Sequence, residues 1–307
     1  MARRNFRKLD GILLLDKSLG ASSNRVLQDA RFLYQAAKAG HTGSLDPLAS
    51  GMLPVCFGEA TKVSAFLLDA DKCYVTTAQL GAMSDTGDAE GTLFDQKDVP
   101  AFTEAEIEAV LECFRGPIQQ IPPMYSALKK DGQPLYKLAR QGVEIERESR
   151  PVIIHELILK GFTADTLSLE VRCSKGTYIR TLVEDIGKAL KCGAYVSMLR
   201  RTEVSPFNDL PMYTFDSLKA SFEQGGMSAL DEYLLPMDQA LPHLPALTLN
   251  DDDLGRLRQG QKLSLKVFPD GAPEQREIIR IYDASGVFSG LGEVTELALK
   301  PKRMLAC

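Results

Sequence analysis

An aspartate inside a glycine-rich segment is the residue of this sequence best suited to do chemistry. The segment from Gly40 to Gly51 reads GHTGSLDPLASG, and most of its other residues are small or apolar. By pattern alone, an Asp-Pro pair such as Asp46 with its proline is most often a turn. The segment lacks the signatures of a P-loop, a dinucleotide-binding turn and a serine elbow. A glycosidase-type carboxylate pair is also unsupported, because no second acid is singled out near Asp46.

The composition indicates a soluble globular protein. The chain has 307 residues, enough for one large domain or one large and one small, and 44% of them are apolar. The longest apolar runs, such as GILLL at 11–15, fall far short of the roughly 20 residues that span a bilayer. No apolar signal region follows the basic N-terminus. We therefore expect a cytoplasmic protein without a membrane segment.

Neither the cysteines nor the histidines form a metal-binding pattern. The cysteines at 56, 73, 113, 173, 192 and 307 include no C-x-x-C pair. The histidines at 41, 155 and 243 are too scattered for a His-x-x-x-His site. We expect no metal, no cofactor, and reduced cysteines that are buried as small apolar residues.

Basic residues cluster locally although the net charge is −5. The net charge argues against a protein that coats nucleic acid indiscriminately. The clusters suit a selective polyanion binder, although ordinary solvated surfaces have the same pattern. The bases are Arg3, Arg4, Arg7, Lys8 and Lys17 near the N-terminus, and Arg172, Lys175, Arg180, Lys188, Lys191, Arg200 and Arg201 further on.

The elements that must position Asp46 alternate between strand and helix patterns without regular βαβ spacing. An apolar run at 11–17 predicts a buried strand, and apolar residues at helical spacing after Ser22 or Ser23 predict a helix that Gly40 ends. Three other helices are predicted: one near 59–68, one from the capping box of Thr103 and Glu106 to about Phe114, and one from Tyr178 to about Leu190. Strands are predicted at 72–81, 151–159, 166–173 and 195–204. This alternation favours an α+β fold over a doubly wound one.

Two segments depart from this pattern. Residues 116–150 mix proline, glycine and tyrosine with bases, and only LYKLARQ has helical spacing, so we expect a mobile excursion that clamps a ligand. After Pro236 a proline-rich linker precedes residues 244–307, where one short helix and short strands predict a small β-rich domain. We therefore expect one domain over 1–240 and a smaller one over 244–307.

Several ordered motifs resemble those of the TruB family of tRNA pseudouridine synthases. GHTGSLDPLASGMLPVCFGEATK resembles the family's catalytic motif, with DKSLGASSN at 16–24 before it and DADKCYVTTAQLG at 69–81 after it. The match continues through DTGDAEG at 85–91, FRGPIQQIPPMYSALKKDG at 114–132, CSKGTYIRTLVEDIG at 173–187 and MLRRTEVSPF at 198–207. So many long motifs in the family's order make the match specific.

The resemblance implies a fold, an activity and a partner. The fold would be that of the pseudouridine synthases, a mixed, largely antiparallel sheet flanked by helices, followed by a PUA-like RNA-binding domain. The activity would be isomerisation of a uridine to pseudouridine in the T-loop of tRNA, after the base is flipped out. The enzyme would bind the T-arm of tRNA and would act alone, without a guide RNA, a cofactor or an obligatory protein partner.

Three catalytic residues follow from the resemblance. Asp46 corresponds to the family's nucleophile, Tyr74 to the tyrosine that stacks on the uracil, and Arg180 to the arginine that pairs with the aspartate. The carboxylate can attack the uracil ring, attack C1′ of the ribose, or act as a base at C2′, and an arginine partner keeps it ionised in a dry pocket. The sequence does not choose among these routes.

Four further residues are predicted to bind the substrate. His41 would help to hold the flipped-out base, Tyr178 would line the base pocket, and Leu199 would pack under the uracil. Lys17 matches the lysine of the family's first motif. The RNA itself would be held by the N-terminal bases, the bases of 129–150, Arg200 and Arg201, and by Lys300, Lys302 and Arg303 in the smaller domain.

Two other functions fit the same residues. The first is that of a guide-RNA-directed pseudouridine synthase, although the loop of those relatives reads more like Asp-Pro-Lys-Val-Thr-Gly than DPLASG. The second is that of a non-catalytic RNA-binding or RNA-folding protein. The presence of Asp46, Tyr74 and Arg180 together argues against a loss of catalysis.

Overall fold

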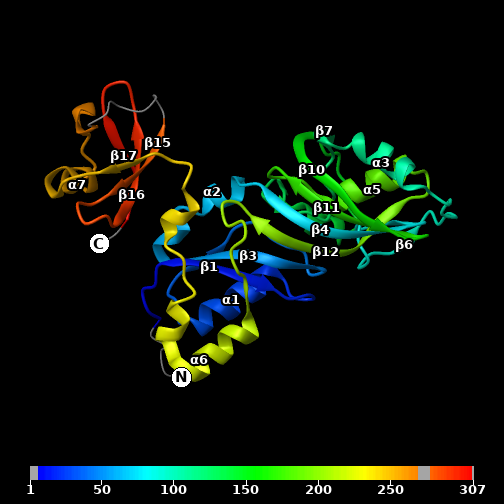
Figure 1. Cartoon of the computed structure of the whole chain (residues 1–307), viewed down its shortest axis with the longest axis horizontal. Helices are drawn as coiled ribbons and strands as arrows, with labels where there is room; N and C mark the ends of the chain where they lie inside the picture. The colour runs from blue at the N-terminus through cyan, green and yellow to red at the C-terminus, as the bar shows by residue number, and fades with distance from the viewer. Residues whose placement is uncertain (1–5, 269–276, 306–307) are drawn as a thin grey trace.

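A nine-stranded sheet forms the centre of the molecule, and a separate four-stranded sheet lies at its C-terminal end (Figure 1). The computed structural model describes residues 6–268 and 277–305. Arg3, Arg4 and Cys307 lie outside these ranges.

The large sheet is mixed and largely antiparallel, as predicted. The β1–β13 and β3–β12 pairs are parallel, and the other neighbouring strands are antiparallel. Its order is β13 (Tyr213–Thr214), β1 (Gly11–Lys17), β3 (Ala49–Phe57), β12 (Ala194–Val204), β4 (Lys72–Leu80), β11 (Thr166–Cys173), β10 (Arg150–Phe162) and β7 (Gly116–Gln120), with β2 (Ala39–His41) paired to β3.

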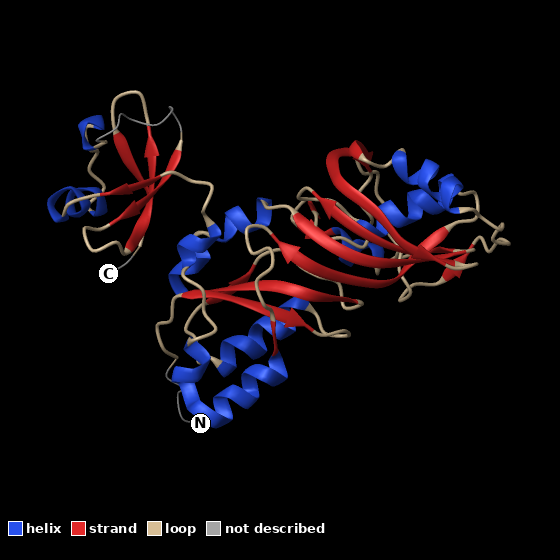
Figure 2. Ribbon diagram, viewed as in Figure 1, coloured by secondary structure: helices blue, strands red, loops and turns tan. Residues whose placement is uncertain are grey.

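Helices cover the two halves of this sheet in separate groups (Figure 2). α1 (Ser23–Leu33) and α6 (Phe215–Asp231) pack on β1 and β3 through a core that includes Leu13, Val55 and Leu218. α3 (Glu104–Glu112) and α5 (Ile179–Ala189) pack on β4, β10 and β11. The 3-10 helix η1 (Gly58–Lys62) and α2 (Ser64–Asp69) connect β3 to β4.

Short elements fill the connections between the large ones. The predicted excursion begins as the edge strand β7 and contains the hairpin of β8 (Lys129–Lys130) and β9 (Gln133–Pro134) and the helix α4 (Leu135–Ala139). A second hairpin, β5 (Met83–Ser84) with β6 (Leu93–Phe94), follows β4. The predicted capping box of Thr103 and Glu106 is present at the start of α3.

The C-terminal sheet has its own core and also contacts the main body. It contains β14 (Ala246–Thr248), β15 (Ile278–Tyr282), β16 (Phe288–Val294) and β17 (Leu299–Met304), with α7 (Asp251–Arg258), η3 (Leu265–Val267) and, in the linker, η2 (Met237–Ala240). Leu291 packs in the same apolar cluster as Ile12 of β1. The Tyr282 hydroxyl donates to Asp238 Oδ2 at 2.8 Å, and Lys62 Nζ donates to the Met304 carbonyl at 3.0 Å.

Three local expectations differ from the structure in detail. α1 ends at Leu33 rather than at Gly40, because Gln35 has a positive φ of 50° and the Ala37 amide donates to the Arg7 carbonyl instead of continuing the helix. The helix expected near 59–68 is two short helices, η1 and α2. Cys113 is exposed rather than buried.

No helix in 6–268 or 277–305 combines the length and apolar character needed to cross a bilayer. Within the same ranges, no cluster of histidine, cysteine and acidic side chains could hold a metal ion.

Candidate active site

Six of the seven predicted site residues line one cavity of about 400 Å³. These six residues are His41, Asp46, Tyr74, Tyr178, Arg180 and Leu199. The cavity walls come from the loop between β2 and β3, the start of β4, residues 125–127, the turn into α5, and β12. Small-molecule sites usually have volumes of about 300–1,000 Å³, so a nucleobase fits. Segments far apart in the sequence therefore meet at one site.

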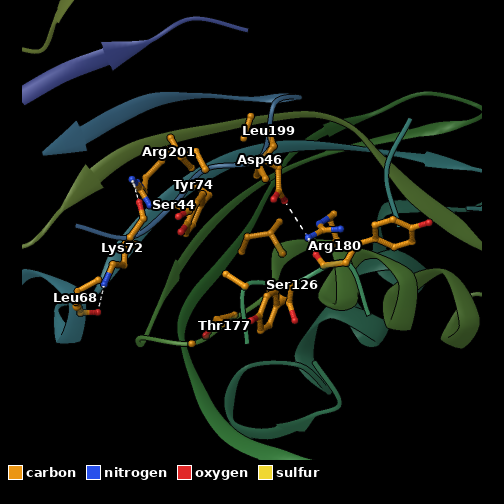
Figure 3. Close-up of a pocket in the computed structure, with 18 of the residues that line it drawn as sticks. Ser44, Asp46, Leu68, Lys72, Tyr74, Ser126, Thr177, Arg180, Leu199 and Arg201 are labelled. Atoms are coloured by element: carbon orange, nitrogen blue, oxygen red, sulfur yellow. Dashed lines mark hydrogen bonds and ion pairs between the residues drawn. The ribbon is translucent and has the colours of Figure 1, made fainter. Parts of the chain in front are cut away.

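Asp46 reaches into this cavity from the loop that precedes β3 (Figure 3). Its Oδ2 lies 3.0 Å from Arg180 Nη2, and its side chain keeps 44% of its surface accessible because it faces the cavity. Burial by the cavity walls raises the pKa of Asp46, while the charge of Arg180 opposes that rise. The ion pair thus favours the charged carboxylate that nucleophilic chemistry requires.

Arg180 is almost fully buried and is held from three sides. Its Nη1 donates to the Thr86 carbonyl and its Nη2 to the Tyr125 carbonyl, both at 2.7 Å. A glycine is needed at Gly87, where φ is +75° and an added Cβ would lie 3.2 Å from Arg180 Cβ. These contacts fix the guanidinium so that it points at Asp46.

Asp88 is a second carboxylate near Arg180, and it was not among the predicted site residues. It is 3% exposed, and its Oδ2 lies 3.9 Å from Arg180 Nη1. Its Oδ1 accepts hydrogen bonds from Thr86 Oγ1 at 2.6 Å and from the Glu90 amide at 3.1 Å. Its charge adds to the factors that raise the pKa of Asp46. The sequence did carry a signal for this residue, because Asp88 lies in the motif DTGDAEG.

Tyr74 and Leu199 form an apolar part of the cavity. Tyr74 lies on β4 and Leu199 on the neighbouring β12, and both belong to the same core cluster. Burial raises the pKa of Tyr74, so its hydroxyl stays protonated at neutral pH. An aromatic ring and a leucine side chain at these positions provide surfaces against which a flat base can pack.

Tyr178 is positioned by a buried amide group. It stands immediately before α5, where its backbone amide donates to Gln120 Oε1 at 3.0 Å and its carbonyl accepts from Gln120 Nε2 at 3.3 Å. Gln120 is 2% exposed and ends β7. The pair of hydrogen bonds joins the edge strand to the helix start, and Tyr178 faces the cavity as predicted.

Lys17 lies beneath the loop that carries Asp46 and is not among the residues that line the cavity, whereas the sequence predicted that it binds the substrate. It is 1% exposed, and its Nζ donates to the carbonyls of Ser18 at 2.9 Å, Ala49 at 2.6 Å and Pro47 at 3.4 Å. Burial lowers its pKa to about 8, while the Asp46 charge opposes that change. In this structure, Lys17 therefore contacts the backbone of the loop that carries Asp46.

Arg201 holds the same loop and is not free to grip RNA, contrary to the prediction from its motif. It is 1% exposed, and it donates to the Met52 carbonyl at 2.7 Å and to the Gly43 carbonyl at 3.0 Å. Arg200, also expected to bind RNA, forms an ion pair with Asp16 at 2.7 Å. The motif MLRR identified these positions, but the direction of each side chain depends on the strand pairing of β12.

His41 and Lys72 line the cavity near Arg201. Burial, together with the charge of Arg201, lowers the pKa of His41, which favours the neutral imidazole. His41 Nδ1 is buried without a hydrogen-bond partner among the described residues. Lys72 Nζ donates to the carbonyls of Leu67, Leu68 and Ala70, so it holds the end of α2 at the cavity rim.

Comparisons with known proteins cover nearly the whole chain. Residues 31–179 match the TruB family pseudouridylate synthase N-terminal domain, 180–242 the tRNA pseudouridylate synthase B C-terminal domain, and 245–305 the C-terminal region of pseudouridine synthase II TruB. The chain is 51% identical over 306 residues to a tRNA pseudouridine synthase B of Pseudomonas fluorescens (strain Pf0-1), covering 99% of this chain and 98% of that relative.

Two further similarities agree with this result. The chain is 50% identical over 306 residues to a tRNA pseudouridine synthase B of Pseudomonas aeruginosa (strain UCBPP-PA14), again covering 99% and 98%. Among solved structures, it resembles a chain of an H/ACA ribonucleoprotein bound to a substrate RNA containing 2′-deoxyuridine, with a TM-score of 0.73, 25% identity, and coverage of 97% of this chain and 85% of that one. The chain belongs to the TruB family of pseudouridylate synthases.

Proposed function

We propose that this protein isomerises a uridine to pseudouridine in the T-loop of tRNA and acts without a guide RNA. The observation that carries the proposal is the 3.0 Å ion pair of Asp46 with the buried Arg180, in a cavity walled by Tyr74 and Leu199. The names of the relatives, tRNA pseudouridine synthase B, support tRNA as the substrate. The T-loop is the position that the sequence resemblance implies.

The reaction requires a carboxylate and no redox partner. The N1–C1′ bond breaks, the uracil turns, a C5–C1′ bond forms, and C5 loses its proton while N1 gains one. Asp46 stabilises the separated base and sugar by attack on the ring, by attack on C1′, or as a base at C2′. All three routes need Asp46 ionised, and Arg180 supplies the charge that favours this form.

The other cavity residues bind the flipped-out base. Extruding a base from folded RNA costs a few kcal/mol, which stacking and hydrogen bonds in the pocket must offset. Tyr74 stacks on the uracil, Leu199 packs beneath it, and Tyr178 closes the side of the pocket. His41 stabilises the extruded conformation from the loop that carries Asp46. Lys17 supports that loop.

The remaining RNA contacts come from two basic regions. The first is the segment 121–149, where Lys129, Lys130, Lys137 and Arg140 are exposed. Residues 125–127 of the same segment line the cavity, which supports a contact between these basic side chains and the RNA around the flipped nucleotide. The second is a C-terminal RNA-holding domain over 244–307, joined by the linker to a catalytic domain over 1–240.

The test is incubation of the purified protein with a T-arm RNA, followed by detection of pseudouridine at single-nucleotide resolution. We expect one pseudouridine, in the loop, without added protein or guide RNA. A product at another position would refute the T-loop assignment, and no product under conditions where the RNA binds would refute the proposed activity.

A guide-directed function is the second candidate, because the fold resembles a chain of an H/ACA ribonucleoprotein. This candidate predicts no product with bare tRNA transcript and recovery of activity when a guide RNA and partner proteins are added. The same assay therefore separates the two functions.

A further inference from the structure

We infer that Ser23 is a positioning residue for Asp46, and this inference rests on the proposed function of Asp46 as the nucleophile. Ser23 is the first residue of α1 and is 4% exposed. Its hydroxyl makes two hydrogen bonds with one loop residue, Leu45, which immediately precedes Asp46 in the sequence.

The two bonds hold both sides of Leu45. The Leu45 amide donates to Ser23 Oγ at 2.7 Å, and Ser23 Oγ donates to the Leu45 carbonyl at 2.9 Å. The Leu45 carbonyl and the Asp46 amide belong to one planar peptide unit. Fixing that carbonyl therefore fixes the plane from which the Asp46 side chain leaves the backbone.

The support behind Ser23 is rigid. α1 is anchored in the core through Val26, Leu27 and Ala30. Ser22, next to Ser23, caps the same helix by accepting a hydrogen bond from the Arg25 amide at 3.2 Å, and it is exposed. Two neighbouring serines thus have separate tasks: Ser22 caps the helix, and Ser23 holds the loop.

Ser23 contacts a part of the loop that Lys17 and Arg201 do not reach. Arg201 bonds the carbonyls of Gly43 and Met52, and Lys17 bonds those of Pro47 and Ala49. Only Ser23, among these three side chains, acts on the peptide unit that leads into Asp46. Removal of the Ser23 hydroxyl should therefore release only the peptide unit before Asp46, because the contacts of Lys17 and Arg201 with the rest of the loop remain.

The predicted effect is a slower chemical step with unchanged RNA binding. A displacement of a reacting group by about 1 Å can reduce a rate by about a hundredfold, so we expect a tenfold to hundredfold loss for Ser23→Ala. Ser23 does not line the cavity, and the basic regions lie elsewhere, so the dissociation constant for RNA should stay within about twofold.

The experiment uses the full chain and a T-arm RNA labelled with tritium at C5 of the target uridine. Single-turnover release of tritium is measured with saturating protein for wild type, Ser23→Ala and Ser22→Ala. Ser22→Ala is the matched control, because it weakens the helix cap but keeps the loop bonds. Should Ser23→Ala fold poorly, Ser23→Cys replaces it, since a thiol is a similar size and only a weak hydrogen-bonding group.

Hydrogen exchange of the Leu45 amide gives a readout that does not depend on activity. The inference predicts faster exchange of this amide in Ser23→Ala than in Ser22→Ala, together with the slower tritium release. It is overturned if the two variants release tritium at equal rates, or if Ser23→Ala loses only RNA affinity or thermal stability. If wild type releases no tritium while the exchange difference persists, the proposed function fails and the loop contact stands.

Discussion

Asp46 and Arg180 differ in burial, and this difference separates their roles. The Arg180 side chain is 7% exposed and bonds the backbone on two sides, whereas 44% of the Asp46 side chain is accessible. The arginine is therefore part of the rigid frame, and the carboxylate is the group that a ligand can reach.

Replacing Asp46 with asparagine should remove turnover and leave RNA binding nearly intact. The substitution replaces one carboxylate oxygen and removes the charge, while the basic residues proposed to bind RNA are unchanged. We expect the single-turnover rate to fall below about a hundredth of wild type, with an RNA dissociation constant within about tenfold. Asp29→Asn, which alters a surface acid paired with Arg25, is the control and should be unchanged. A residual rate above that limit would contradict the assignment of Asp46 as nucleophile.

Removing Arg180 should move the acidic limb of the pH–rate profile to higher pH. The reaction needs ionised Asp46, so the rate falls as the pH drops through the pKa of that carboxyl. Arg180 lowers this pKa; without it the pKa rises, and activity is lost at a higher pH. We expect a lower maximal rate and a shifted limb for Arg180→Ala.

Two further variants make this test specific. Arg180→Lys keeps the charge and should return the limb toward its wild-type position. Arg172→Ala removes an arginine that pairs with Glu203 at 2.9 Å and should leave the limb in place. An unshifted limb in Arg180→Ala would mean that the ion pair does not control Asp46.

The motifs predicted which residues lie at the site, but they did not predict where every side chain points. Asp46, Tyr74, Tyr178 and Leu199 face the cavity as expected. Lys17, in contrast, turns beneath the loop, because its partners are backbone carbonyls brought together only by folding. From sequence alone, a lysine is normally expected to be a charged surface residue, because the backbone carbonyls that could bind it in the interior cannot be identified.

At the scale of elements, the close approach of β3 and β12 determines where the site forms. Their parallel pairing is short and joins Ala49 to Leu199 and Gly51 to Arg201. The catalytic loop enters β3 at this point, so the pairing sets the distance between the loop and the strand that carries Leu199 and Arg201.

Gly51 should be sensitive to a single added methyl group. An alanine Cβ there would lie 2.1 Å from the Arg201 carbonyl oxygen, and φ is +99°. Forcing this contact should lower the free energy of unfolding by about 1–3 kcal/mol. Gly116→Ala is the matched control, because Gly116 has a φ of +79° in the same sheet but open space around it. Urea unfolding of both variants measures the difference, and equal values would show that the strands can move apart.

Two elements of the large domain could not be predicted from their local sequence pattern. The strand β3 was not predicted, because its segment continues the glycine-rich motif and contains Pro54, which cannot donate to a neighbouring strand. α6 was also not predicted; a glycine pair interrupts it, and Gly226 has non-helical backbone angles. In both cases tertiary packing overrides a weak local pattern.

At the scale of the whole molecule, the C-terminal sheet allows RNA affinity to be tested separately from the chemical step. The C-terminal sheet lies on the far side of α2 from β4 and β12 (Figure 1), and none of its described residues is among those that line the cavity. Its last strand, β17, exposes Lys302 and Arg303. If this region binds RNA, Lys302 and Arg303 should affect the RNA affinity and the salt dependence of that affinity. They should not affect the reaction rate of the bound complex.

Replacing Lys302 and Arg303 with glutamine in the full chain should therefore make RNA binding weaker and less dependent on salt. Each phosphate that the protein no longer neutralises takes about one unit from the slope of log affinity against log salt, so the slope should fall by up to about two. The single-turnover rate at saturating protein should stay at the wild-type value, because Asp46, Tyr74 and Arg180 are untouched. Lys219→Gln is the control: Lys219 lies on α6 and pairs with Glu223, much as Lys302 pairs with Glu293. An unchanged slope in the double variant would mean that β17 does not contact RNA, whereas a slower bound-state rate would mean that the C-terminal sheet shapes the active site.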